Sequence, residues 1–282
     1  MRLKARNIFK KIMGVYTIVF IIVIYAPFFI IGFLSFTGPK GGVTFPVDYP
    51  LGWHWYKQLS KVPYLVSSLK TSLTLAIMTL ITSTVLGLLT AMAFRRKFKG
   101  QNVVFYTVLL GLVVPGILVG LGTALTCQAV NYFPSWYVTG YGVHVVWTYP
   151  FCFIIMLAVF NRFDSSLEDA ARNLGAREWR VFKTITFPLI SLGTLSCALF
   201  GFTLSYDELT RSLLAMGFQR TLPVNVWAEV AVRIKPTWYA FGVLTTLFSF
   251  FVLILYALLF RFFSAKQKKG ALAQEEVVSL NA

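Results

Sequence analysis

Charged side chains are scarce in this sequence, and acidic ones are scarcer still. Only 13% of the 282 residues are charged, 57% are hydrophobic and the mean hydropathy is +0.72, which is too apolar for an ordinary soluble domain. The 10 acidic residues face 26 basic ones, and the net charge of +16 would suit nucleic acid if the basic residues shared one face of a soluble fold. They occur instead in short islands between long uncharged runs, so the sequence indicates a lipid bilayer, and no nucleic acid, as a partner.

Cysteine and histidine are also rare, and no catalytic pattern accompanies them. Cys127, Cys152 and Cys197 lie far apart inside apolar runs, without the spacing of metal ligands or of a disulfide framework, and are interpreted as packing residues. The sequence has no G-x-x-x-x-G-K-[ST] phosphate-binding loop, and its apolar runs contain no paired carboxylates or nucleophile arrangement. We therefore expect a subunit that is not itself an enzyme and that holds no cofactor or metal.

What the sequence does contain is long runs without Lys, Arg, Asp or Glu. A helix needs about 20 apolar residues to cross the hydrocarbon layer of a membrane. The uncharged runs cover residues 12–36, 71–94, 102–161, 184–206 and 236–260, and a polar break at 131–135 divides the longest one into two spans. The sequence thus predicts an all-α polytopic membrane protein with six transmembrane helices, at about residues 12–36, 68–94, 102–130, 140–161, 186–207 and 237–263.

The basic islands decide the predicted orientation in the membrane. Six spans place both termini on one side, and loops rich in Lys and Arg face the cytoplasm. Most basic residues fall in the N-terminal segment 1–11, in the loops after the second and fourth spans and after residue 260, so these four segments are predicted to be cytoplasmic. The first run is too long for a signal-peptide core and lacks a small-residue cleavage site after it, so we expect a retained helix. The C-terminal tail 266–282 is expected to be partly disordered.

The loop between the first two spans, 37–63, is interpreted as structural. Its early part has the Gly and Pro residues typical of turns. Its later part, 52–59, mixes aromatic and polar residues and suits a short helix at the membrane interface, where His54 is assigned a structural role.

Two features inside the predicted spans leave alternatives open. Pro115 precedes Gly116 and Gly120, a GxxxG spacing that lets helices approach closely. Packing within the bundle is the default interpretation, and a partner-subunit interface or a bend beside the pathway are the alternatives. His144 stands alone in an apolar span and is interpreted as a satisfied core residue, with a proton carrier as the alternative.

The longest predicted cytoplasmic connection, 162–187, has the features of a short helix followed by a corner. Ser165 and Glu168 have the S-x-x-E spacing of a capping box, and Gly175 suits a left-handed helix stop. A second helical stretch, 176–184, leads to Pro188, which suits the first turn of the next span. The first helix carries a narrow apolar stripe made partly of very small side chains: Leu167, Ala170, Ala171 and Leu174. These residues alone are consistent with a helix lying on the inner membrane surface and with a helix that docks a partner.

The spacing of this loop resembles the EAA loop of ABC importer permeases, whose pattern is Glu-Ala-Ala, three residues, Gly, nine residues, then Ile-x-Leu-Pro. Asp169 stands where the pattern has Glu and Phe187 where it has Leu, which keep the charge and the bulk. In that family the loop forms a coupling helix seated in a cleft of the ATPase subunit. The resemblance implies the type I importer permease (MetI-like) fold and assigns ATPase coupling to Glu168, Asp169, Ala170, Ala171, Leu174, Gly175, Ile185 and Pro188.

The resemblance also implies the partners. Because the chain lacks a phosphate-binding loop, ATP and Mg are expected in a separate ATPase. The expected assembly contains two ATP-binding cassette ATPase subunits, a second homologous permease and a periplasmic substrate-binding protein, in the inner membrane of a bacterium. ATP-driven closure of the ATPase pair would then switch the pathway between inward-facing and outward-facing states.

The fifth span and its outer end resemble the second permease of spermidine/putrescine-type importers, through the segments 202–208 and 222–227. Tyr206, Asp207 and Glu208 are accordingly predicted to border the substrate pathway, for a small cationic solute such as a polyamine. Arg211 is close enough along the chain to satisfy one of the two carboxylates by a local ion pair, which is the structural alternative.

Other functions stay open from the sequence alone. Related importers carry opines, aminophosphonates or ferric iron. An ATP-independent secondary transporter is the main alternative from another class, because six helices with an intramembrane histidine would also suit ion exchange.

Overall fold

The computed structural model describes residues 2–38, 51–232 and 234–280, and the turn-rich positions predicted at 39–50 lie outside the described residues. The regular secondary structure of the described residues is entirely helical, without a strand, which confirms the predicted all-α class. The elements are α1 Arg2–Leu34, α2 His54–Gln58, η1 Leu59–Lys61, α3 Leu65–Phe94, α4 Gln101–Val113, α5 Gly116–Ala129, η2 Trp136–Gly140, α6 Tyr141–Phe160, α7 Ser166–Asn173, α8 Glu178–Val181, η3 Phe182–Thr186, α9 Phe187–Tyr206, α10 Ser212–Ala215, α11 Leu222–Val232 and α12 Thr237–Leu280.

Among the described residues, five helical segments are long and apolar enough to cross a membrane. They are Phe9–Leu34, Leu65–Phe94, Trp136–Phe160, Glu178–Tyr206 and Thr237–Ala265, and the pair α4 and α5 makes a sixth only if the two helices form one broken span. The chain divides into two compact units: unit 1 comprises residues 1–63 and 228–251, and unit 2 comprises 64–227 and 252–282.

Unit 1 contains α1, the short helix α2 and the first part of α12. The short helix predicted at 52–59 is confirmed as α2, followed by the 3₁₀ turn η1. Its buried Trp55 donates a hydrogen bond to Thr37 (3.3 Å), and the Tyr56 hydroxyl lies 2.8 Å from the hydroxyl of Ser35. His54 lies 2.7 Å from Gln58, one turn further along the helix. The contacts of Trp55 and Tyr56 connect α2 to the residues that directly follow α1.

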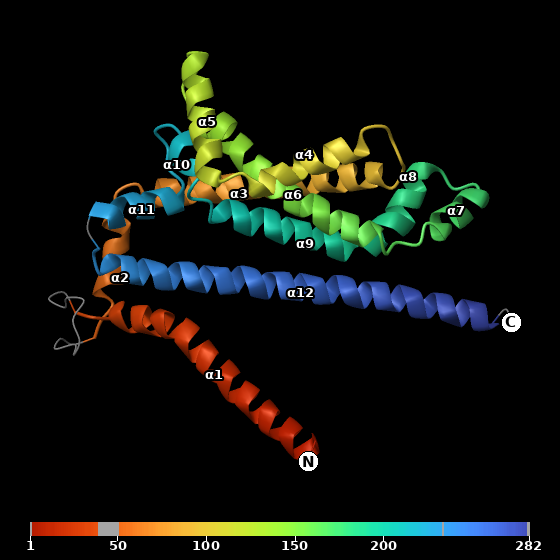
Figure 1. The fold of residues 1–282 in the computed structure, drawn as a ribbon, viewed down its shortest axis with the longest axis horizontal. Coiled ribbons are helices and arrows are strands. Elements are labelled where there is room, and N and C mark those ends of the chain that lie inside the picture. Colours follow the sequence, from red (N-terminus) through yellow and green to blue (C-terminus); the bar gives the residue numbers. More distant parts are fainter. Residues whose placement is uncertain (1, 39–50, 233, 281–282) are drawn as a thin grey trace. The chain divides into compact units, whose positions relative to one another are not determined.

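The core of unit 2 is formed by α3, α6 and α9, which pack side by side (Figure 1). Small residues stand at the closest approaches, as expected where lipid offers no hydrophobic driving force between helices. A Cβ atom on Gly87 would lie 2.7 Å from the Cβ of Cys152, and one on Gly201 would lie 3.1 Å from the Cα of Leu80. Cys152 and Cys197 each direct their thiol at the other's carbonyl oxygen, at 3.5 and 3.4 Å. The two cysteines are buried packing residues between α6 and α9.

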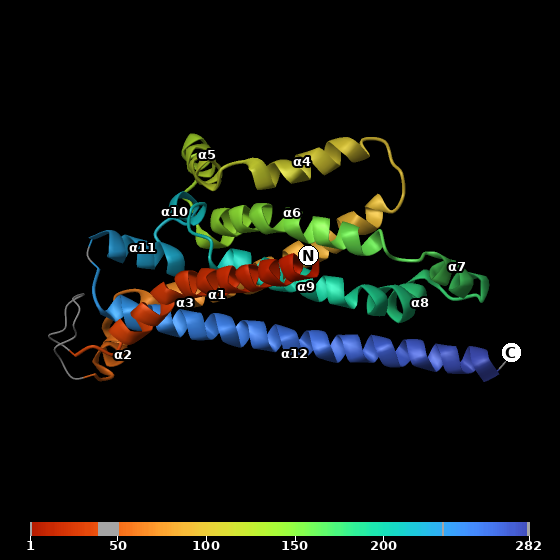
Figure 2. The same ribbon diagram turned by 60° about the horizontal axis from the view of Figure 1, so that its bottom comes forward.

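The third predicted span is interrupted at Pro115. Proline has no N–H to continue a helix and disfavours helical backbone in the residue before it, and Val114 is accordingly extended. The axes of α4 and α5 differ by 101°. At about 1.5 Å per residue, neither helix alone spans about 30 Å of hydrocarbon. The single span expected over residues 102–130 is therefore a bent pair of helices, and Figure 2 shows α5 turned away from the direction of α4.

The fifth span begins earlier than predicted. The elements α8, η3 and α9 follow one another without a gap, so the helical run starts at Glu178. Pro188 lies in the first turn of α9, as predicted, and the preceding segment η3 is a π-helix. A π-helical turn is a common way to accommodate the hydrogen bond that a proline cannot donate.

The C-terminal segment differs from its prediction. Helix α12 continues through residue 265 to Leu280, where the sequence was expected to be partly disordered. The physical reason is composition: residues 266–280 are rich in Lys, Gln, Glu, Ala and Leu, which are good helix formers.

Candidate functional site: the helix α7 and its anchor

Helix α7 is an eight-residue amphipathic helix between α6 and α8, and Figure 2 shows it beyond the ends of α6 and α9. Glu168 and Asp169 lie in its first turn, and Gly175 follows it with φ +82°, which confirms the predicted left-handed stop. The predicted capping box is wrong. Ser165 makes no side-chain cap, and the Asp164 carboxylate instead accepts a hydrogen bond from the backbone N–H of Ser166 at 2.9 Å.

Glu168 is not at the cap because its side chain points into the bundle. It is buried, and Arg95 donates two hydrogen bonds to its two carboxylate oxygens at 3.0 and 2.6 Å. The buried hydroxyl of Thr186 donates a third at 2.5 Å. Burial alone would raise the pKa of Glu168, but the hydrogen bonds from Arg95 and Thr186 and the positive charges of Arg95 and Arg172 outweigh it, so the pKa is lowered.

This carboxylate connects α7 to all three core helices. Arg95 directly follows α3, and its guanidinium lies over the rings of Phe160, at the end of α6, and Phe163, 5.2 and 5.0 Å from their centroids. Thr186 is the last residue before α9. One buried charged group thus lies between α7 and the adjoining ends of α3, α6 and α9.

The opposite face of α7 has no partner within the described residues of this chain. Leu167 and Leu174 are 44% and 89% exposed, and Ala170 is exposed beside them. Ala171 is half-buried. The predicted stripe thus exists as a surface of two leucines and small side chains.

Arg172 holds the corner between α7 and α8. It donates hydrogen bonds to Asp169 at 2.8 Å and to Glu178 at 2.7 Å, and its partners are exposed.

The last two residues predicted for coupling lie beyond this corner: Ile185 is half-buried in η3, and Pro188 is exposed in the first turn of α9. The loop residues predicted for coupling therefore form one continuous path from α7 through α8 and η3 into α9.

A second polar cluster lies after α9. Glu208 is buried and accepts hydrogen bonds from the hydroxyl of Thr210 and the backbone N–H of Arg211, both at 2.9 Å, and its second oxygen pairs with the guanidinium at 3.1 Å. The local ion pair considered from the sequence is therefore formed by Glu208. Tyr206 ends α9 half-buried, and Asp207 is exposed. Desolvation and the neighbouring Glu208 raise the pKa of Asp207.

The GxxxG sequence provides the space for Arg211. A Cβ atom on Gly116 would lie 2.7 Å from its Nη1, and one on Gly120 would lie 2.9 Å from its carbonyl oxygen. The guanidinium also lies 3.9 Å from the ring centroid of Trp147. The structure thus supports the default interpretation of the two glycines, which is close packing within this chain.

His144 is fully buried beside this cluster. Its Nδ1 lies 2.7 Å from the hydroxyl of Ser205, and its Nε2 lies 2.9 Å from that of Ser212. A hydroxyl can donate or accept, so a neutral ring is satisfied at both nitrogens. This geometry is that of a structural histidine.

Comparisons with known proteins agree with this architecture. Residues 83–264, more than half of the chain, match the family described as "Binding-protein-dependent transport system inner membrane component". The chain is 29% identical over 223 residues to the putrescine transport system permease protein PotI of Escherichia coli (strain K12), covering 76% of this chain and 78% of that protein. It is 25% identical over 240 residues to the spermidine/putrescine transport system permease protein PotC of Haemophilus influenzae, covering 84% and 92%.

A solved structure shares the fold. A chain of a bacterial ABC transporter involved in the import of the acidic polysaccharide alginate superimposes with a TM-score of 0.70 at 16% identity, covering 91% of this chain and 96% of that one.

Proposed function

Since the chain belongs to the family of binding-protein-dependent transport system inner membrane components, we propose that α7 is the element through which a separate ATPase drives it. The chain is a multi-pass permease subunit of an ABC importer. The observation that carries the proposal is the two-sided helix α7: one face is bound to the core through Glu168, and the other exposes Leu174. ATP and its Mg would be bound by the partner ATPase.

The coupling would work because ATP binds the closed state of the ATPase more tightly than the open state, and each state holds α7 in a different position. An ATPase cleft that closes on ATP binding moves the α7 surface it holds, and the Glu168 anchor transfers this displacement to α3, α6 and α9. The arrangement needs no chemistry in this subunit. It needs only that α7 and the core helices move together.

Replacing Leu174 by alanine is expected to weaken retention of the ATPase by about tenfold, because the side chain would be buried only in the complex. The variant chain itself should stay as stable as the wild type, since Leu174 is 89% exposed in it. Copurification from membranes with the ATPase, followed by measurement of ATP hydrolysis in proteoliposomes, gives both readouts.

Leu258→Ala is the matched control, because Leu258 is also exposed, at 58%, but belongs to α12 and not to the loop 162–187. It should retain the ATPase fully. Equal retention in the L174A and wild-type complexes would remove Leu174 from the docking surface. Uptake by proteoliposomes that contain no ATPase would contradict the whole proposal and favour a secondary transporter.

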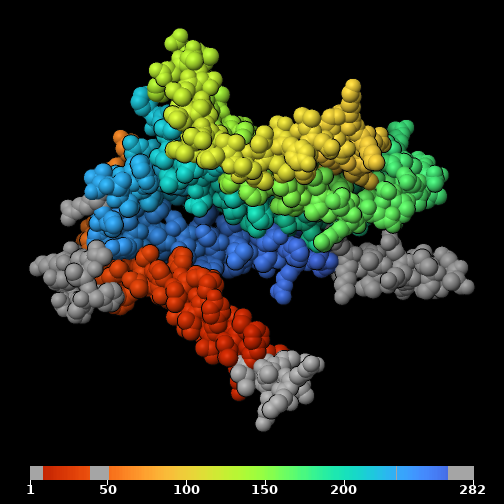
Figure 3. Space-filling view, viewed as in Figure 1, coloured from red at the N-terminus to blue at the C-terminus, as the bar shows by residue number. Residues whose placement is uncertain are grey.

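The remaining partners follow from the family. We propose two ATPase subunits, a second homologous permease and a periplasmic binding protein, in the bacterial inner membrane. Helix α5 projects from the rest of unit 2 in Figure 3 and exposes Ile117, Leu118, Leu121 and Leu125. A projecting apolar helix fits a surface that a second permease covers.

For the substrate we propose a small cationic solute of the polyamine class, as the names of PotI and PotC suggest. Of the two carboxylates in the polar cluster after α9, Asp207 is the one that can attract the cation. Glu208 is bound to Arg211, whereas Asp207 has no ion pair with a described basic side chain. Tyr206 and Asp207 would then border the pathway, while Glu208 would hold Arg211 next to them.

Neutralising Asp207 as D207N is expected to reduce uptake of a labelled polyamine by about fivefold, since an attraction of roughly 1 kcal/mol between partly solvated charges is lost. Uptake assays in cells and a check of assembly by copurification measure the two effects separately. D207E keeps the charge and should restore most of the uptake. Unchanged uptake in D207N would exclude contact between Asp207 and the cation.

A further inference from the structure

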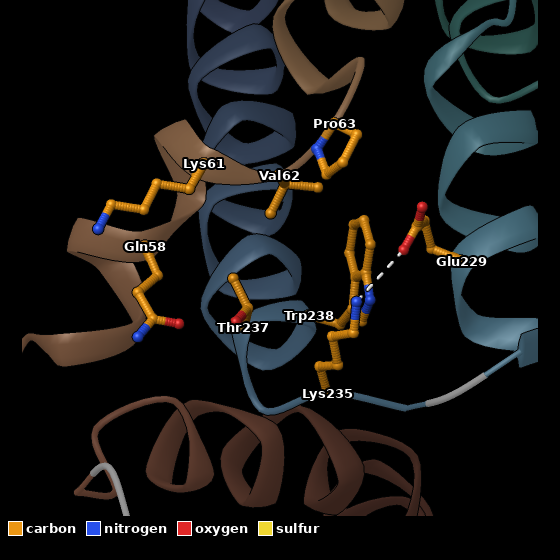
Figure 4. Close-up of a pocket in the computed structure, with 8 residues that line it drawn as sticks. All are labelled: Gln58, Lys61, Val62, Pro63, Glu229, Lys235, Thr237 and Trp238. Carbon is orange, nitrogen blue, oxygen red and sulfur yellow. Dashed lines mark ion pairs between the residues drawn. The ribbon is translucent and has the colours of Figure 1, made fainter.

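A pocket of about 150 Å³ lies in unit 1, where α2 and η1, the end of α11 and the start of α12 meet (Figure 4). It has room for about five water molecules, at about 30 Å³ each. Its polar lining consists of Gln58, Lys61, Glu229, Lys235, Thr237 and Trp238. None of these residues belongs to the coupling helix or to the cluster around Arg211.

The indole of Trp238 gives the first indication of a ligand. The residue is only 7% exposed, and its buried N–H has no hydrogen-bond acceptor among the described residues. A buried donor without an acceptor is rare in proteins because it loses its bond to water without a replacement. The indole is a donor only, so the missing partner is an acceptor.

The charges around the pocket indicate that the acceptor is an anion. Two cations and one carboxylate line it, and the carboxylate of Glu229 is paired with Lys235 at 3.6 Å. Lys61 is exposed at the rim and has no ion pair with a described acidic side chain. The N-terminus of α12, which begins at Thr237, adds the positive end of a long helix dipole.

The surroundings of the pocket indicate that the anion belongs to a lipid. Tyr and Trp side chains gather at the level of lipid headgroups. Here the ring of Phe36 packs against those of Trp53 (edge to face) and Tyr56 (tilted), with ring centroids 5.0 and 5.3 Å apart, and Trp238 is the second residue of the apolar helix α12. In the alternation of spans along the chain, both pocket-forming segments lie on the side opposite to the basic loops.

We propose that this pocket binds the phosphodiester of a membrane lipid headgroup in the outer leaflet. The indole N–H of Trp238 would donate to one phosphate oxygen, Lys61 would balance the negative charge, and Lys235 would neutralise Glu229 beside it. Such a lipid would hold α2 and the start of α12 together at the membrane surface.

The test uses the purified full chain in detergent and native mass spectrometry with three probes: phosphatidylglycerol, diacylglycerol with the same acyl chains, and inorganic phosphate. One saturable phosphatidylglycerol adduct per chain is expected. W238F should weaken its binding by about tenfold, since it removes a single hydrogen bond to a charged group. K61Q and K235Q should each weaken it by about fivefold.

The W238F variant separates a binding role from a structural one. Phenylalanine keeps a buried aromatic ring but removes the unpaired donor together with part of the indole, so the lipid-free variant should lose some stability to the cavity left behind. The binding role is therefore measured as lipid affinity of the folded chain, which a merely structural role of Trp238 would leave unchanged. K57Q and W53F are the matched controls, because Lys57 and Trp53 lie in or beside α2 but do not line the pocket. They should bind the lipid as the wild type does.

Wild-type affinity in W238F and in both lysine variants would overturn the proposal. Equal binding of diacylglycerol would show that acyl chains alone are recognised and would also overturn it. Inorganic phosphate bound as tightly as the lipid would exclude a lipid as the intended source of the anion.

Discussion

Replacing Glu208 by glutamine is expected to lower the free energy of unfolding by about 3–5 kcal/mol, which is the cost of leaving a buried charge without its partner. The guanidinium of Arg211 is 5% exposed, so water cannot replace the lost carboxylate. A loss of this size is a large part of the total stability of a typical domain, and the variant chain should accumulate poorly in membranes. Thermal unfolding of the purified chain and its steady-state amount in membranes measure the effect.

The adjacent carboxylate supplies a matched control. D207N makes the same chemical change one residue away, but Asp207 is exposed, so stability should change by less than about 0.5 kcal/mol. The double variant E208Q/R211Q removes both charges and should recover much of the lost stability, because an uncharged pair leaves no buried ion. A double variant as unstable as E208Q would show that shape, and not charge, holds this cluster.

The environment of Arg211 also shows what the sequence was able to predict. The spacing of Gly116 and Gly120 predicted a close approach, and the structure confirms one within the chain. The identity of the approaching group was not encoded locally, since Arg211 lies far along the sequence. Trp147, whose ring lies against the guanidinium, carried no signal either, because an aromatic residue in an apolar run resembles any other packing residue.

The outline of the fold was predictable because its signals are local. Uncharged runs set the helices, and Gly175 marked the end of α7 through its need for positive φ. Pro115 was visible as well, but its effect was underestimated: a proline kinks or ends a helix according to the tertiary contacts on both sides, which the sequence does not show.

The anchor of α7 was missed for a different reason. Glu168 was assigned to a capping box because Ser165 stands three residues before it. Arg95 was interpreted only as one of several basic residues that set orientation. The two residues are 73 positions apart, and nothing local distinguishes Arg95 from Arg96 or Lys97 as a partner for a buried carboxylate. Long-range pairing of charges therefore required the structure.

Replacing Glu168 by glutamine is expected to uncouple transport from ATP hydrolysis. The change leaves Arg95 without a counter-charge between α3 and α7, which should lower the free energy of unfolding by about 2–3 kcal/mol. This loss is smaller than for a fully buried pair because Arg95 is partly exposed. The ATPase should still bind the exposed face of α7 and hydrolyse ATP, while uptake falls by at least about tenfold. Simultaneous measurement of ATP hydrolysis and uptake in proteoliposomes tests this prediction.

Asp169 is the control for Glu168, because the two residues are neighbours on α7 and carry the same charge. Its carboxylate is exposed and pairs only with Arg172 at the surface, so D169N should change stability by no more than about 1 kcal/mol.

Lowering the pH provides a second test of the Glu168 anchor. The pKa of Glu168 is lowered in the folded chain, so the anchor is fully present above the ordinary carboxyl pKa and is lost as the pH falls through the folded value. Uptake and hydrolysis that decline together in E168Q would assign Glu168 to ATPase binding, whereas hydrolysis that persists without uptake assigns it to the transfer of motion.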